Sequence, residues 1–505
     1  MNLPGLLAAV MLVLDGGSLT QPYDIEGEHE GPDVGLVETL PHELRKFDVQ
    51  AARVRFEALD RALDRTREPI ARANLVLERA TLHAAHGMHE SLLSLTALLR
   101  QDEIEDPAQK QAVAPEITAH KQASTRANAR AIADFTELVC DPQDREKAFA
   151  CRAPAALHGW PAMDEALYRL AFILNHERRE DDARHVLRRI VDHHPTSRHH
   201  TDALLGVADV AFRRIEFAEA EPLYQRVLTG PGPAMSRAYA ASMLGWVQLN
   251  LGRDAKAFTS FTTAAALAGH EPRAKYILRA ARQDLVRAYA GFGTVADAFA
   301  AFERSAPGHG LELLVRLGET WFDQGKATEA IAVFVDLRQR APDDPRACEW
   351  QDAIARGVDL LADLARQVAE IEQLQAALAR ARSQPSVEHL ARCTELTRKH
   401  TLELAYAFHL DFMRTRDRAT ADRVERLYAA FVTSFPTDAE TPRVRYARAE
   451  AAWLRAEIER SDAKQWSLAA SRYDEAIAGG LDPKLRADAE FSRDLARKYA
   501  ATRGR

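Results

Sequence analysis

Residues 311–344, LELLVRLGETWFDQGKATEAIAVFVDLRQRAPDD, decide the fold of this 505-residue chain. Apolar residues recur every three or four positions, which is the period of an α-helix with one buried face. Gly318 and Ala330 are small enough to let two helices approach each other closely, and Trp321 and Phe334 can fill the space between them. The stretch therefore predicts a pair of helices packed as a hairpin.

The same pattern recurs upstream, in units that begin at residues 164, 201, 238 and 279. In the unit that begins at residue 311, the pattern occupies positions 4, 7, 8, 11, 20, 24 and 32 of 34 with Leu314, Leu317, Gly318, Trp321, Ala330, Phe334 and Pro342. This spacing resembles the tetratricopeptide repeat (TPR). The resemblance implies an all-α fold, a superhelix of stacked helical hairpins (an α-solenoid), and it says little about function.

The repeats suggest how the chain is organised. We expect a signal peptide in residues 1–20, an acidic flexible linker in 21–44, divergent helical hairpins in 45–160, about five repeats in 161–345, connector helices in 346–404, and degenerate repeats with a capping helix in 405–505. Within the connector, residues 346–382 have the pattern of one long helix, and Ser386 is placed to cap the next one.

The amino-terminal segment favours export. Residues 3–14 (LPGLLAAVMLVL) form an apolar run that is too short to span a bilayer but suits a signal peptide. Eight acidic residues and no Lys or Arg occupy residues 1–44, so the remaining chain is almost neutral although the net charge is −7. We therefore expect a periplasmic or secreted protein. The alternative is a cytoplasmic protein in which residues 3–14 belong to the fold.

The four cysteines bear on the same question. Cys140 and Cys151 are separated by a mostly polar stretch, and their spacing allows a disulfide between two helices. Two unpaired thiols packed as small apolar residues are an equally good interpretation. Cys348 and Cys393 lie in helical patterns typical of buried positions.

The resemblance implies a concave groove lined by the first helix of each repeat. Family positions that face this groove carry aromatic and polar residues suited to binding a protein or peptide. We expect the partner-binding residues to be Tyr168, Phe172, Phe212, Arg213, Tyr239, Trp246, Asn250, Arg287 and Phe322. For the phenylalanines, core packing between repeats is the alternative. The Lys and Asn pair with which chaperone-binding repeats hold a carboxylate is missing from these positions, so that role is not expected.

Other functional classes find little support. A nearly neutral body argues against nucleic-acid binding. We find no catalytic or phosphate-binding motif, so we expect neither enzymatic activity nor a cofactor. Residues 193–200 (HHPTSRHH) are rich in histidine but match no known metal-ligand spacing, so no metal site is expected.

The leading hypothesis is a non-catalytic scaffold for protein–protein interactions in a bacterial cell-envelope assembly. Residues 240–252 and 281–302 resemble envelope TPR proteins of myxobacteria, some of which belong to gliding-motility machinery, although the lipobox cysteine frequent in those proteins is missing. A cytoplasmic regulatory or peptide-sensing module is the alternative. An enzyme, with its site in residues 45–160, is the third class.

Overall fold

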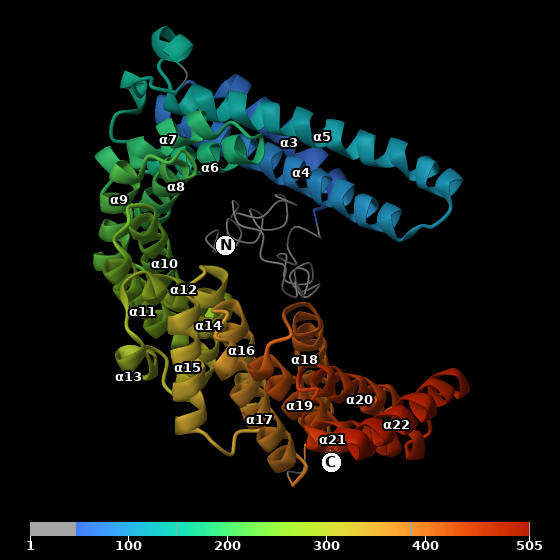
Figure 1. Cartoon of the computed structure of the whole chain (residues 1–505). Coiled ribbons are helices and arrows are strands. Elements are labelled where there is room, and N and C mark those ends of the chain that lie inside the picture. The colour runs from blue at the N-terminus through green and yellow to red at the C-terminus, as the bar shows by residue number, and fades with distance from the viewer. Residues whose placement is uncertain (1–46, 148, 384–385, 504–505) are drawn as a thin grey trace. The chain divides into compact units, whose positions relative to one another are not determined.

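The computed structural model describes residues 47–147, 149–383 and 386–503, and every regular element in these ranges is a helix (Figure 1). This confirms the all-α fold class and the helical hairpins. The predicted signal peptide and acidic linker lie outside the described residues. No described helix is both long enough and apolar enough to cross a bilayer.

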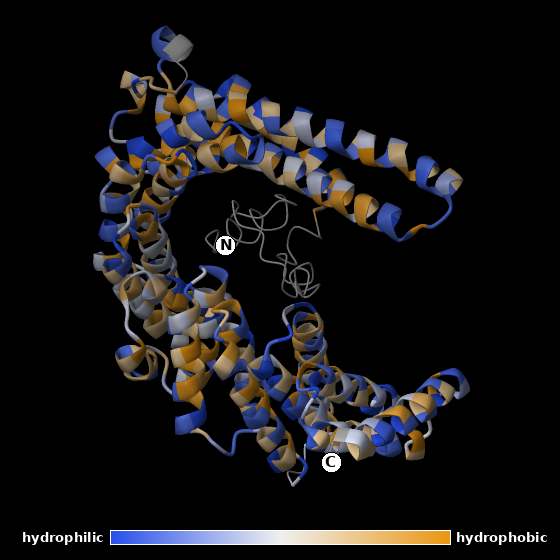
Figure 2. Ribbon diagram, in the orientation of Figure 1, coloured by the Kyte–Doolittle hydropathy of each residue, from blue (hydrophilic) through white to orange (hydrophobic). Residues whose placement is uncertain are grey.

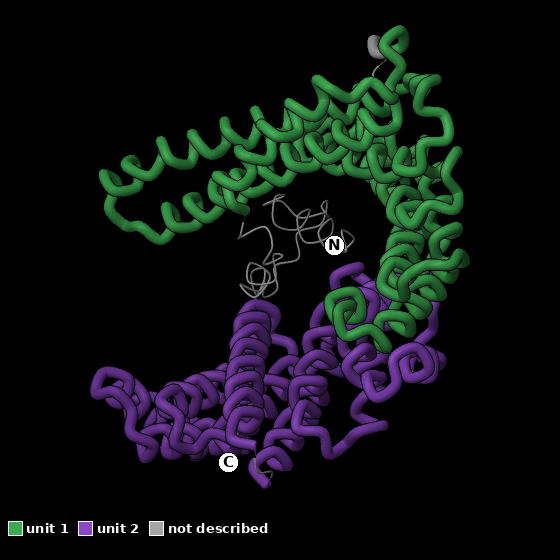
Figure 3. Tube along the Cα trace, turned by 180° about the vertical axis from the view of Figure 1, so that it is seen from behind, with its two compact units in different colours: residues 1–278 green, residues 279–505 purple. Residues whose placement is uncertain are grey.

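The chain divides into two compact units, residues 1–278 and 279–505, and the division falls inside α12 (Figure 3). The predicted array 161–345 is therefore shared between the two units. The described helices of the first unit are α3 (Val49–Arg65), α4 (Pro69–Glu103), α5 (Pro107–Val139), α6 (Met163–His176), α7 (Glu180–His193), α8 (His200–Arg213), α9 (Phe217–Thr229), α10 (Ala234–Asn250) and α11 (Asp254–Gly269). Short 3-10 turns, η1 (Pro142–Lys147), η2 (Ala155–Leu157) and η3 (Pro272–Ala274), join some of them.

The second unit continues in the same way. Its helices, beginning with the one that spans the division, are α12 (Lys275–Phe292), α13 (Val295–Ser305), α14 (Gly310–Asp323), α15 (Ala327–Arg340), α16 (Ala347–Leu360), α17 (Leu364–Ala381), α18 (Val387–Thr415), α19 (Arg418–Ser434), α20 (Thr441–Ile458), α21 (Ala463–Ala478) and α22 (Pro483–Arg503). Polar and apolar residues alternate around these helices, as amphipathic packing requires (Figure 2).

The repeat register is confirmed by packing. The alanine at position 20 of each predicted unit is fully buried between two helices: Ala183, Ala220, Ala257, Ala298 and Ala330 are all 0% exposed. A Cβ atom on Gly318 would lie 2.6 Å from the ring of Phe334, and one on Gly245 would lie 2.6 Å from the ring of Phe261. Glycine is therefore required where the aromatic ring of the second helix meets the first.

The region 45–160, where divergent helical hairpins were expected, contains a hairpin that is longer than a repeat. Two long helices, α4 with 35 residues and α5 with 33, pack side by side along their length, whereas α6 and α7 have 14 residues each. Gly87 does not interrupt α4. It makes room for the buried side chain of Asn128 on α5, because a Cβ atom there would lie 1.9 Å from the Asn128 oxygen. Gly87 therefore serves the packing of α4 against α5.

The prediction of one long helix over residues 346–382 is wrong. A turn at Ala362, whose φ is 53°, separates α16 from α17. The carboxylate of Asp363 accepts a hydrogen bond from the N–H of Arg366 and caps α17. The two helices begin 17 residues apart, at Ala347 and Leu364, and α14 and α15 also begin 17 residues apart, at Gly310 and Ala327. The connector is thus one more hairpin of the array, while the cap predicted at Ser386 is confirmed.

Candidate functional site

A cavity of about 830 Å³ lies within the second unit, lined by α14, α16 and α18 and by neighbouring residues. These are alternate helices of the chain, as expected for the inner face of stacked hairpins. The residues that line it are Val315, Glu319, Phe322, Asp323, Phe334, Arg346, Glu349, Trp350, Asp352, Ala353, Arg356, Asp359, Gln367, Arg392, Leu396, Lys399, His400, Glu403, Leu404 and Ala407. The cavity therefore combines an apolar surface with many charged groups.

Phe322 is held in this cavity by its neighbours and remains half-buried. Its ring stacks on Phe334, with the centroids 5.8 Å apart. On α16, Gly357 allows close approach, because a Cβ atom there would lie 2.9 Å from the Phe322 ring. The aromatic ring is thus fixed in position while part of it still faces the cavity.

His400 joins α18 to α16 through two carboxylates. One ring nitrogen, Nε2, lies 2.6 Å from Asp359, and the other, Nδ1, lies 3.2 Å from Asp352. Burial lowers the pKa of His400, but the hydrogen bonds and charges of Asp352 and Asp359 outweigh it and raise the pKa to about 9. His400 is therefore a buried cation at neutral pH, and Arg356 pairs with Asp352 at 3.0 Å on its other side.

Other charges of the cavity have no ion-pair partner within 4 Å among the described residues. On α14 these are Glu319 and Asp323, which are both exposed. The surrounding protein still partly desolvates the carboxyl of Glu319, which raises its pKa; Asp323 adds to the effect, and Arg316 and Arg356 oppose it. On α18 they are Arg392, Lys399 and Glu403, again exposed. These groups are available to a ligand.

A disulfide between Cys348 and Cys393 ties α16 to α18 beside this cavity. The sequence predicted that both cysteines are buried, which is confirmed at 3% and 0% exposure, but it did not predict the bond. Residues far apart in sequence become paired only because residues 346–381 fold as a hairpin.

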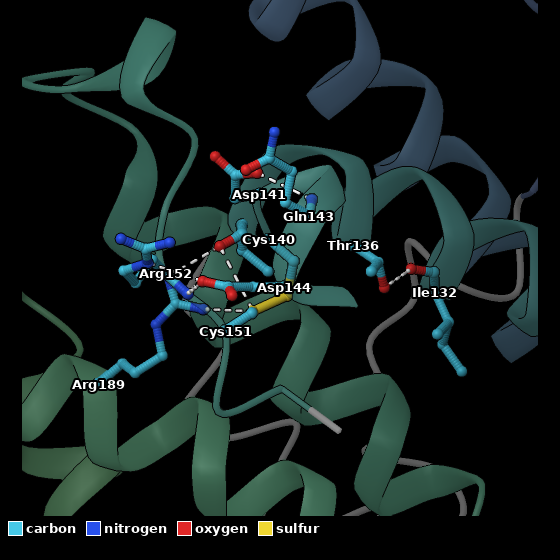
Figure 4. The surroundings of a disulfide bond; sticks show 10 residues. Ile132, Thr136, Cys140, Asp141, Gln143, Asp144, Cys151, Arg152 and Arg189 are labelled. Atoms are coloured by element: carbon cyan, nitrogen blue, oxygen red, sulfur yellow. Dashed lines mark hydrogen bonds and ion pairs between the residues drawn. A yellow bond between two sulfur atoms is a disulfide. The ribbon is translucent and has the colours of Figure 1, made fainter. Parts of the chain in front are cut away.

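The disulfide between Cys140 and Cys151 in the first unit was one of two interpretations of the sequence, and the structure contains it (Figure 4). It joins the end of α5 to the segment before α6. Arg189 of α7 lies against it, with one nitrogen 3.4 Å from the Cys151 sulfur and another donating to the carbonyl of Val139 at 2.9 Å. No described cysteine is free.

The predicted groove residues of α6 are buried. Tyr168 is 1% exposed and stacks on His199, with ring centroids 4.1 Å apart. Phe172 is 8% exposed and packs against Met88 of α4. Neither side chain exposes enough surface to bind a partner. Phe172 packs in the core, which was the alternative interpretation, and Tyr168 is buried in the same way.

The two predicted groove residues of α8 keep part of their surface exposed to solvent. Phe212 is half-buried, with its ring 5.6 Å from that of Phe217, and Arg213 forms an ion pair with Glu180 at 2.9 Å.

On α10, the hydroxyl of Tyr239 lies 3.3 Å from Asp209, which also accepts from Tyr224 at 2.6 Å. Burial raises the pKa of Asp209 to about 6. Trp246 packs edge-on against Phe261 at 6.0 Å, and the exposed Asn250 donates to the Trp246 carbonyl at 2.8 Å.

The remaining two predicted residues belong to the second unit. Arg287 on α12 is half-buried, 4.0 Å from Asp284, and does not line the cavity. Phe322 is the one residue of the predicted set that does line it. The cavity's other groups, such as Trp350 and His400, lie in the segment that the sequence assigned to a connector. The helix cap at Asp363 marks the start of a separate helix, α17, and was the sequence signal that could have placed these residues on a repeat hairpin.

The histidine-rich stretch belongs to a contact between hairpins. His199 is 5% exposed, and its Nε2 lies 2.6 Å from Glu165 on α6. Within the described part of the chain, no group of three or more His, Cys, Asp or Glu side chains is placed to hold a metal ion.

Comparison with known proteins identifies the repeat. Residues 165–197, which span α6 and α7, match the family model of the tetratricopeptide repeat. No curated protein matches the chain in sequence. A solved structure that aligns with it is the TPR domain of P58(IPK), over 74% of this chain and 94% of that one, at 15% identity and a TM-score of 0.19. At that TM-score the alignment carries no argument about function.

Proposed function

We propose that the protein is a non-catalytic TPR scaffold that binds another protein of a bacterial cell envelope through the cavity on α14, α16 and α18. The observation that carries the proposal is the half-buried Phe322 beside charged groups that lack partners. Fixed aromatic side chains next to polar groups are the usual anchors of a protein interface. Repeats of this kind generally act by binding rather than by catalysis.

Export is part of the proposal. Both disulfides support it, because such bonds persist in oxidising compartments and are rare in the cytosol. The apolar run at residues 3–14 agrees with it. The resemblance to myxobacterial envelope proteins makes gliding-motility machinery the first assembly in which to look for the partner.

Replacing Phe322 by Ala should reduce partner recovery about tenfold in a pull-down from native envelope with cross-linking. The substitution removes the anchor while leaving the buried residues of the hairpin in place. Phe491→Ala is the matched control, because Phe491 is 72% exposed on α22 of the same unit and does not line the cavity. Trp246→Ala tests in parallel whether the first unit contributes. Equal recovery with Phe322→Ala and Phe491→Ala would contradict the cavity assignment.

A further inference from the structure

The unpaired charges of the cavity differ between the two helices: α14 carries two acids, whereas α18 carries the two bases Arg392 and Lys399 and one acid, Glu403, and so keeps a net positive charge. Glu319 and Asp323 are four residues apart on α14, so they share one helix face. Arg392 and Lys399 are seven residues apart on α18, with Leu396 between them, and also share a face. The first pair forms what we call the acidic wall, and the second pair the basic wall.

Helix α16 lies between these walls. It contacts α18 directly, through the disulfide and His400, and it meets α14 where Gly357 packs on Phe322. The charged groups of α16 that line the cavity already have partners: Asp352 and Asp359 bind His400, Arg356 binds Asp352, and Glu349 meets His389. Between them lie the buried side chains of Trp350 and Ala353.

Resting on the proposed function, we infer that the cavity selects a peptide segment in which a basic and an acidic residue flank an apolar one. The basic side chain pairs with Glu319 and Asp323, and the acidic one with Arg392 and Lys399. The apolar residue contacts Phe322.

The acidic and basic walls lie on different helices, so the basic and the acidic residue of the segment pair with different sides of the cavity. A strongly anionic polymer would be repelled by the acidic wall, and a purely apolar segment would leave both walls unpaired.

The test is selection of a phage-displayed library of random dodecapeptides on the full chain. The wild type should enrich peptides with Lys or Arg on one side of an apolar residue and Asp or Glu on the other. The variant E319Q/D323N should lose the enrichment of basic residues and keep that of acidic ones, and R392Q/K399Q should do the reverse. All four side chains are exposed, so these changes leave the packing intact. E329Q on α15 is the control, since Glu329 is exposed and outside the cavity.

The outcomes separate this inference from the function on which it rests. If the selected peptides lose binding to the Phe322→Ala variant but show the same charges in all variants, the cavity binds peptides and the charge inference is wrong. If the peptides bind Phe322→Ala as well as the wild type, the proposed site itself is wrong. If the wild type enriches no peptide, both are contradicted.

Discussion

Replacing His400 by Ala should make the amides of α16 and α18 exchange with deuterium about 100-fold faster than in the wild type at pH 6.5. The substitution leaves Asp352 and Asp359 without their shared cation, and Asp352 is only 5% exposed. Breaking a buried ion pair by removing one partner typically costs about 3 kcal/mol or more, which corresponds to roughly this factor. Exchange resolved by peptide on the full chain measures the effect where it arises.

The same contact makes stability depend on pH. The pKa of His400 is about 9 in the folded chain and lies near 6.5 in an unfolded one. A pKa raised by folding stabilises the fold fully below the unfolded value, and this contribution is lost as the pH rises through the folded value. The ratio of exchange rates between His400→Ala and the wild type should therefore shrink between pH 6.5 and pH 9.5. Comparing the two proteins at one pH removes the intrinsic pH dependence of exchange.

His389→Ala is the matched control for this prediction. His389 lies on the same helix and meets Glu349 at 3.3 Å, but about a third of its side chain is exposed. Exposed pairs contribute about 1 kcal/mol or less, so exchange should rise by at most a few-fold. A similar effect of both substitutions would show that His400 is not a buried cation.

Removing the disulfide between Cys348 and Cys393 should cost the second unit about 4 kcal/mol. The bond closes a loop of 45 residues, and the chain-entropy account gives this magnitude because the unfolded chain loses conformations when it is cross-linked. The variant C348A/C393A should therefore exchange faster in α16, α17 and α18, while the peptides of the first unit stay unchanged.

The second disulfide provides the comparison. Cys140 and Cys151 are separated by 11 positions, for which the same account gives about 3 kcal/mol. The variant C140A/C151A should change exchange at the end of α5 and in α6 and leave the second unit alone. If C348A/C393A left α16 and α18 as protected as in the wild type, the disulfide would not be what ties these helices together.

Packing residues made the repeats predictable from the sequence. Gly318 and Ala330 must be small, and Phe334 large, because their side chains meet between the two helices of one hairpin. Their spacing in the sequence therefore indicates the fold directly. The repeat register gave a wrong prediction for Tyr168. Its position in the repeat predicts that it faces the groove and is exposed, but it is buried. In the structure His199 covers its ring, because the turn between α7 and α8 folds onto α6.

Most of the candidate site could not be predicted, because it depends on contacts between hairpins. His400 becomes a buried cation only when α18 packs on α16, 41 positions from Asp359 in sequence. The misassigned turn at Ala362 hid this arrangement, since the apolar pattern continues through it without Gly or Pro. The cap at Asp363 was the local clue, and together with the 17-residue offset it would have placed α16 on the inner face.

The most direct test of the central claim is photo-cross-linking in the native envelope, with a benzophenone side chain placed at Glu403 in one variant and at Glu329 in another. Both positions are exposed in the second unit, but only Glu403 lines the cavity. We predict a covalent adduct with a partner protein from position 403 and none from position 329. An adduct formed from position 329 while position 403 yields none would contradict the assignment of this cavity as the partner-binding site.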